Sequence, residues 1–176
     1  FAVRIAAGSA HLVLGCDNVV AVEETTLGKM RHGLTRVILN TNEAMPGGFT
    51  RNPDMKFPRP AMEQALADTV GDDHLHRVDA TRMATAIMGD SIATNLFMLG
   101  YAWQMGEIPV SFEALDKAIE LNAIAVASNR RAFAWGRMAA HDIKAVEQAA
   151  NPGIPVQLKT AVTLDELIEK RRTFLV

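Results

Sequence analysis

Four polar side chains at the ends of two expected strands could together bind a ligand. Asp17 and Asn18 follow one short apolar run, and Asn40 and Thr41 close another. In a parallel α/β sheet, ligands bind in the crevice beyond the carboxyl ends of the strands. Asp17, Asn18, Asn40 and Thr41 are therefore candidate crevice residues. The alternative is that Asp17 and Asn18 only cap the following helix, while Asn40 and Asn42 make turns.

The other reactive side chains form no recognisable catalytic or metal-binding pattern. Cys16 has no basic neighbour in the sequence, and the adjacent Asp17 would raise the pKa of its thiol, so a small buried residue is expected there. His74 and His76 would share one face of a strand, but no third His or Cys lies in range to complete a metal site. The sequence therefore assigns no catalytic residue and no metal ligand.

Signatures for phosphate groups and for thiamine diphosphate are also missing. Neither G-x-G-x-x-G nor G-x-x-x-x-G-K-[ST] occurs. Gly89-Asp90 followed by Asn95 is similar to a thiamine diphosphate signature, but that motif needs a far longer gap to place both side chains on one Mg²⁺. Asp90 is better explained as a helix cap, and Asn95 as a buried amide that must find backbone partners.

The candidate crevice depends on a sheet of parallel strands. Apolar runs at 12–14 and 35–41 flank a helical pattern at 19–30, and this βαβ spacing favours a right-handed crossover in a parallel sheet. A weaker third strand is expected at 74–79, after a helix at 61–70. Together these elements predict an α/β fold.

Two further segments of the first sixty residues lie outside the expected strands. Residues 1–8 resemble the last turns of a helix that ends at Gly8. Residues 42–60 are too rich in proline and glycine for regular structure, and a loop of this length is usually functional, a partner-binding arm or a lid.

From residue 80 onward the pattern is helical. After Asp90 the stretch 89–103 carries no charged residue and is apolar on every side, which is typical of a membrane span or of a core helix. Its unbroken apolar part is too short to cross a bilayer. We therefore expect a buried central helix whose Asn95 and Gly100 pack tightly against neighbouring backbone. Further helices are expected at 80–88, 111–122 and 123–150.

The composition excludes several classes of protein. The 176 residues carry 18 basic and 20 acidic side chains, spread without blocks, which gives no electrostatic case for binding nucleic acid or an anionic membrane. The single cysteine rules out an internal disulfide and a cysteine-ligated iron–sulfur cluster held by this chain alone. A reducing, cytoplasmic setting is expected.

Both ends suggest a piece of a larger protein. The chain begins with Phe1 and shows no signal segment, and a capping box at 163–166 starts a helix that has few turns left before Val176. We expect one domain over 1–150, followed at 151–176 by a linker and the start of a further helical region.

Three stretches resemble, in order and spacing, the gamma-type domain of the 2-oxoacid:ferredoxin oxidoreductases. They are DATRMAT at 79–85, GDSIATNLFMLGYAWQ at 89–104 and NRRAFAWG at 129–136. The similarity covers about residues 1–148 and is greatest to the fused indolepyruvate ferredoxin oxidoreductases. The first Gly-rich strand–turn–helix of such a domain is missing from this sequence.

The resemblance implies a Rossmann-like, mostly parallel sheet with flanking helices and a helical C-terminal half. It places this domain in an oligomeric enzyme that decarboxylates a 2-oxoacid such as indolepyruvate with thiamine diphosphate. The acyl group would pass to coenzyme A, and the electrons to ferredoxin or a similar acceptor. Thiamine diphosphate, Mg²⁺ and any iron–sulfur clusters would lie on other domains of the same enzyme, so no cofactor is expected on this chain.

Two hypotheses of function follow. The first is a structural and interface domain, inactive on its own, that helps to form the wall of the coenzyme A or substrate channel. The second is a stand-alone α/β module that binds a nucleotide or an acyl-coenzyme A in the crevice at Asp17, Asn40 and the 42–60 loop.

Overall fold

A parallel sheet lies at the centre of the first half of the chain. The structure, a computed structural model, describes residues 4–43 and 57–151. Strands β1 (Leu12–Gly15), β2 (Arg36–Asn40) and β3 (Leu75–Val78) lie in that order and are parallel. The predicted α/β fold, with a parallel sheet, flanking helices and a mostly helical C-terminal half, is confirmed.

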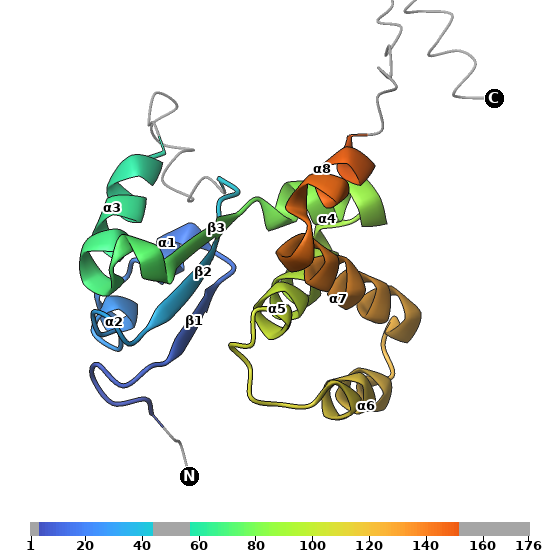
Figure 1. The fold of residues 1–176 in the computed structure, drawn as a ribbon, viewed down its shortest axis with the longest axis horizontal. Helices are drawn as coiled ribbons and strands as arrows, with labels where there is room; N and C mark the ends of the chain where they lie inside the picture. Colours follow the sequence, from blue (N-terminus) through green and yellow to red (C-terminus); the bar gives the residue numbers. More distant parts are fainter. Residues whose placement is uncertain (1–3, 44–56, 152–176) are drawn as a thin grey trace, which may run out of the picture.

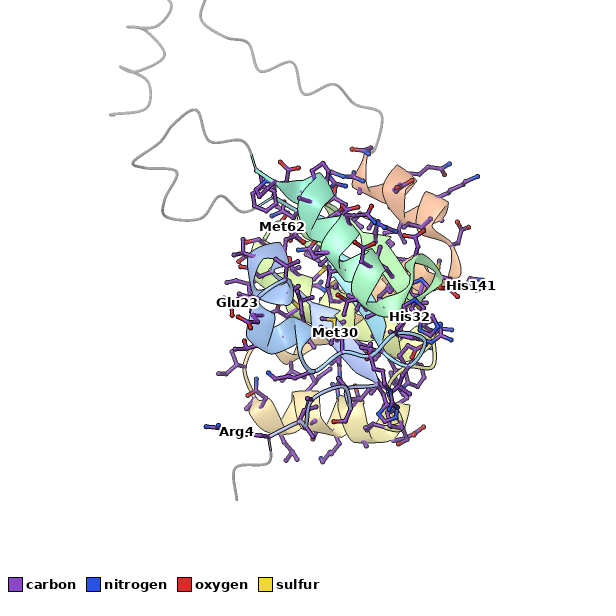
Figure 2. All side chains as sticks on the ribbon, turned by 90° about the vertical axis from the view of Figure 1, so that its left-hand side faces the viewer. Arg4, Glu23, Met30, His32, Met62 and His141 are labelled. Carbon is purple, nitrogen blue, oxygen red and sulfur yellow. The ribbon has the colours of Figure 1, made fainter. Side chains whose placement is uncertain are left out.

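Three helices cover one face of the sheet (Figure 1). They are α1 (Asn18–Ala21), α2 (Glu24–Leu27) and α3 (Arg59–Val70). Figure 2 views this layer, in which Met30 is buried whereas Glu23 is exposed at the outer edge. Val37 and Leu39 of β2 point into this layer and pack with Leu66 of α3.

Four helices cover the opposite face: α4 (Ala80–Met88), α5 (Thr94–Gln104), α7 (Val126–His141) and α8 (Ile143–Ala150). Because successive side chains of a strand point to opposite faces, Ile38 joins this layer while its neighbours in β2 join the other. Ile38 packs in one cluster with Phe97 and Met98 of α5, and all three are fully buried. The expectation of a buried central helix is thus confirmed for α5.

Helix α5 crosses α7 with the two backbones in close contact. A Cβ added at Gly100 would overlap the carbonyl oxygen of Phe133, and one added at Gly136 would overlap the carbonyl oxygen of Phe97. The predicted tight packing of Gly100 is therefore confirmed. Helix α6 (Phe112–Asn122) contacts α7 and lies below both α5 and α7 at the lower edge of Figure 1, and none of its residues is buried.

Several expectations about the helices were wrong. Residues 4–8 are not helical, although Gly8 does adopt a left-handed φ of +63°. The segment 19–30 forms two short helices because the chain is extended at Glu23, which follows a run of β-branched valines that favour helix weakly. The segment 123–150 is interrupted at Asp142, whose carboxylate accepts a hydrogen bond from the amide of Ala145 and so caps α8.

Asn95 is also placed differently from the expectation. It is exposed, because the chain forms a 3-10 turn over Ser91–Ala93 before α5 and places Ile92 and Asn95 on the outer side. Ile92 has 79% of its side-chain surface exposed. The capping box at 163–166 and most of the 42–60 loop lie outside the described residues. None of the helices in 4–43 and 57–151 is long and apolar enough to span a membrane.

Candidate functional site

The carboxyl ends of β1 and β2 bring the four predicted crevice residues to one edge of the sheet. These strands are neighbours, so Asp17 and Asn18, which follow β1, lie beside Asn40 and Thr41 at the end of β2. The side-chain amide of Asn18 donates a hydrogen bond to the carbonyl oxygen of Asn42 across 2.9 Å, which links the two strand ends directly.

Asp17 has a local structural task at this edge. Its Oδ1 atom accepts hydrogen bonds from the amides of Val19 at 2.7 Å and Val20 at 3.2 Å. These are unpaired amides of the first turn of α1, so Asp17 is the N-cap of that helix. The carboxylate of Asp17 therefore caps a helix, which is the alternative role predicted for it from the sequence.

Asn40 joins three elements and is almost fully buried. Its Nδ2 group donates to the carbonyl oxygen of Cys16 at 3.1 Å and to Oγ1 of Thr81 at 2.8 Å. Its Oδ1 atom accepts from the amide of Thr81 at 3.3 Å. Because buried polar groups need partners, this amide holds the ends of β1 and β2 and the first turn of α4 in register.

Sequence reasoning missed Thr81 and Thr94 as members of this cluster. The hydroxyl of Thr94, at the start of α5, donates to Oγ1 of Thr81 at 3.3 Å. Both residues lie in stretches that carry the family resemblance, at 79–85 and 89–104. Their location in these stretches could have marked them as candidates, but nothing in the sequence spacing indicates that both lie near Asn40.

Asn18 is the crevice residue with unused hydrogen-bonding capacity. Only 5% of it is exposed, and its Oδ1 atom has no partner among the described residues. Thr41 is half-buried, and its amide donates to the carbonyl oxygen of Val78 and so extends the sheet. An amide oxygen can accept a hydrogen bond from a ligand, and a hydroxyl can accept or donate one, but neither supplies a general base.

The reactive groups nearby do not turn this edge into a catalytic centre. Burial raises the pKa of the Cys16 thiol, which disfavours the nucleophilic thiolate. In the described part of the chain, no group of three or more His, Cys, Asp or Glu side chains could hold a metal ion. The contacts that Asp17 and Asn40 make at this edge are structural.

Only one member of the predicted histidine pair lies in a strand: His76 is in β3, whereas His74 ends the 3-10 turn at Asp72–His74 that precedes it. Nδ1 of His74 and Nε2 of His76 are buried without a hydrogen-bond partner among the described residues. Burial and the nearby Arg36 guanidinium lower the pKa of His76, so the neutral imidazole is favoured. Within the described residues, neither histidine belongs to a group of three side chains that could hold a metal ion.

Asp90 and Asn95 do not fit a thiamine diphosphate–Mg²⁺ site. Oδ1 of Asp90 accepts a hydrogen bond from the amide of Ile92 at 2.9 Å and caps the 3-10 turn before α5. Asn95 is exposed on α5, one turn further along the chain. The carboxylate is thus engaged with backbone, and this pair offers no cradle for a metal-bound cofactor.

Comparison with known protein families gives one match. A family model described as "Pyruvate ferredoxin/flavodoxin oxidoreductase" matches residues 1–139, which is most of the chain. The matched segment contains the sheet, the candidate crevice and the crossing of α5 over α7. No curated protein and no solved structure matches this sequence.

Proposed function

The chain belongs to the pyruvate ferredoxin/flavodoxin oxidoreductase family, and we propose that it is a non-catalytic structural and interface domain of a 2-oxoacid:ferredoxin oxidoreductase. The complete enzyme would oxidatively decarboxylate a 2-oxoacid, pass the acyl group to coenzyme A and pass the electrons to ferredoxin or a similar acceptor. The family match across residues 1–139 is the observation that carries this proposal.

The contacts at the strand ends support a non-catalytic role for this domain. Asp17 caps a helix, and Asn40 holds three elements together, so neither is available as an acid or base. The described residues also provide no metal cluster and no low-pKa thiol. We propose that thiamine diphosphate, Mg²⁺ and any iron–sulfur clusters are held by other domains, where thiamine diphosphate would supply the carbanion chemistry of decarboxylation.

The crevice would then form part of a channel wall. Asn18 has a buried amide oxygen without a partner among the described residues, and Thr41, a half-buried residue at the end of the neighbouring strand, carries a hydroxyl. Such neutral groups can guide a polar molecule such as coenzyme A or a 2-oxoacid without holding it tightly. Indolepyruvate is the proposed 2-oxoacid, on the strength of the sequence resemblance to the fused enzymes.

The non-catalytic role is tested with the chain of 176 residues by itself. We expect no calorimetric signal with thiamine diphosphate and Mg²⁺, and no indolepyruvate-dependent reduction of a viologen dye with coenzyme A present. The complete enzyme is the positive control for both assays. Turnover by the chain alone would contradict the proposal.

The same chain, titrated with nucleotides and with acyl-coenzyme A, tests the alternative of a stand-alone binding module. Saturable binding that is lost in Asn18→Ala would favour that module over an interface domain. Without such binding, the interface role stands as the better account of the family match.

The channel role is tested in the complete enzyme by Thr41→Val, which removes one hydroxyl and keeps the shape of the side chain. We expect a raised KM for coenzyme A or for the 2-oxoacid. Thr35→Val is the matched control, because Thr35 immediately precedes β2 at the opposite end of the sheet and its hydroxyl donates to the carbonyl oxygen of Ala10. Equal KM values in both variants and the parent enzyme would contradict a channel role.

A further inference from the structure

A second, chemically different pocket lies between α6 and α7, away from the crevice at the strand ends. Its volume is about 150 Å³. It is lined by Phe112, Asp116 and Ile119 of α6 and by Arg130, Phe133 and Arg137 of α7. The pocket thus combines apolar walls with charged groups from both helices, and the proposed function uses none of these residues.

Two of the apolar residues that line the pocket, Phe112 and Phe133, form an aromatic triangle with Trp103 of α5. The ring centroids of Trp103, Phe112 and Phe133 lie 6.0 to 6.2 Å apart, and the rings are tilted against one another. Separations of this size are typical of favourable edge-to-face contacts. Because the indole nitrogen of Trp103 donates to the carbonyl oxygen of Val110 at 2.7 Å, the ring that supports this triangle is fixed in place.

The two arginines of the pocket differ in how they are neutralised. Arg130 makes a two-pronged ion pair with Asp116, with distances of 2.6 and 2.7 Å. Arg137 has no carboxylate within 4.0 Å in residues 4–43 and 57–151. Of the two arginines that line the pocket, Arg137 is therefore the one whose guanidinium forms no ion pair with a described acidic side chain.

Arg137 is nevertheless held in a defined position. Its Nε donates to Oε1 of Gln104 at 3.0 Å, and its guanidinium carbon lies 4.7 Å from the Trp103 ring centroid and 5.3 Å from that of Phe112. Cation–π contacts at these distances are attractive. Neither Nη nitrogen donates to another described residue, so the outer edge of the guanidinium can pair with a carboxylate in the usual bidentate way.

We propose that this pocket binds a small monocarboxylic acid that carries one ring-sized apolar group. The ring would lie against Phe112 and Phe133, and the carboxylate would accept hydrogen bonds from the Nη atoms of Arg137. A cavity of about 150 Å³ with apolar walls accommodates benzene. A monoanion fits better than a phosphate dianion, because Asp116 lines the pocket and Glu120 lies 3.7 Å from Arg130.

The test uses 3-phenylpropionate and the chain of 176 residues, followed by the indole N–H signals of its two tryptophans in NMR spectra. Trp103 belongs to the aromatic triangle, whereas Trp135 packs against the core cluster that contains Ile38, does not line the pocket and serves as an internal reference. We expect a saturable shift of the Trp103 signal, with a Kd on the order of 1 mM for so small a ligand. The Trp135 signal should not move.

Ligand analogues and variants decide which groups bind. Propionate lacks the ring and 3-phenylpropanol lacks the charge, so each should bind at least about tenfold more weakly, as should 3-phenylpropionate to Arg137→Gln. Ala134→Leu should have a similar effect, because Ala134 also lines the pocket and the larger side chain fills it. Arg82→Gln is the matched control, since Arg82 lies on α4 and pairs with Asp79, and it should bind normally.

Three results would overturn the proposal. They are no shift of Trp103 in the parent chain, equal binding by Arg137→Gln and the parent, and tighter binding of phenyl phosphate than of 3-phenylpropionate. Circular dichroism of each variant shows whether the fold is kept. The strand-end crevice contains none of these residues, so the outcome is independent of the experiments on the proposed function.

Discussion

Helix α7 contacts its two neighbours in different ways. Toward α5 the contact is between backbones, with Gly100 beneath the carbonyl of Phe133 and Gly136 beneath the carbonyl of Phe97. Toward α6 the contact is made by long side chains: the aromatic rings, the Arg130–Asp116 pair and Arg137. The first contact leaves no room for a ligand, whereas the second encloses a pocket of about 150 Å³.

The close contact has a repeated sequence pattern. Both helices carry Phe-x-x-Gly, at 97–100 and at 133–136, and the carbonyl of each Phe faces the Gly of the other helix. Because glycine has no Cβ, it allows the helices to approach until their backbones touch. The two faces of α7 therefore differ: one fixes the core, whereas the other leaves a pocket between helices.

The largest expected effect follows from filling the close contact. Gly136→Ala would place a methyl group over the carbonyl oxygen of Phe97 and 2.7 Å from its carbonyl carbon. The helices would have to separate and lose packing along their length, so we expect the free energy of unfolding to fall by more than about 4 kcal/mol. Urea denaturation monitored by circular dichroism measures this change.

Gly106→Ala is the matched control for that substitution. Gly106 has a φ of +82°, and a Cβ added there meets no atom within 4 Å. The control therefore reports only the backbone strain of a left-handed alanine, about 1 kcal/mol. If Gly136→Ala costs no more than Gly106→Ala, the two helices are not in fixed contact and the comparison fails.

A second prediction compares one phenylalanine from each contact. Phe97 is fully buried, whereas Phe112 of α6 has 40% of its surface exposed. Phe97→Ala leaves a cavity in the core and should cost about 3 to 4 kcal/mol, but Phe112→Ala should cost only about 1 kcal/mol. Urea denaturation of both variants gives the ratio. Similar losses would mean that α6 is as much a part of the core as α5.

The strands and most helices could be predicted from the sequence because their signals are local. The apolar runs at 12–14 and 35–41 are confirmed as β1 and β2, and Ser111 caps α6 by accepting a hydrogen bond from the amide of Ala114. The four crevice residues also meet at one edge, because parallel strands place their carboxyl ends together. That this edge binds a ligand stays a prediction.

The features that failed or were missed depend on tertiary contacts. Asn95 was expected to be buried, but the turn at Ser91–Ala93 rotates it outward. The break at Asp142 was missed because an aspartate within a helical pattern can equally face solvent. The pocket beside Arg137 combines residues from α6 and α7, and Trp103 of α5 contacts Arg137, so no spacing within one helix reveals the pocket.

A pH titration probes the side of α5 that faces the sheet. Burial, Arg36 and His74 lower the pKa of His76, while Glu107, which follows α5, raises it less. The unfolded chain therefore takes up a proton at this imidazole more readily than the native chain does. We expect the free energy of unfolding to fall as the pH drops below about 6.5, the pKa of an unperturbed histidine. Urea denaturation at several pH values measures this slope.

His76→Gln should flatten that slope between pH values of about 6.5 and 5, where few carboxylates titrate. His141→Gln is the matched control, because it removes an exposed histidine at the end of α7 by the same substitution. A slope that persists in His76→Gln would show that another group governs the loss of stability in acid.

The smallest expected effect concerns the side-chain contact between α6 and α7. Arg130 and Asp116 form an exposed ion pair, and the hydrogen bond from Arg130 lowers the pKa of Asp116 despite the opposing effect of burial. Exposed pairs contribute little to global stability, so Arg130→Gln should leave the urea midpoint nearly unchanged. It should still speed amide hydrogen exchange in α6, because none of that helix's residues is buried to hold it in place.

Hydrogen exchange also shows whether this loosening stays local. The amides of α5 should exchange at the same rate in Arg130→Gln and in the parent chain, because α5 contacts α7 through backbone and not through this pair. Arg82→Gln, which removes a comparable ion pair with Asp79 on α4, should leave α6 unaffected. If the amides of α5 and α6 instead both exchange faster in Arg130→Gln, the two contacts of α7 open together as one unit. The pocket beside Arg137 would then open only when the core does.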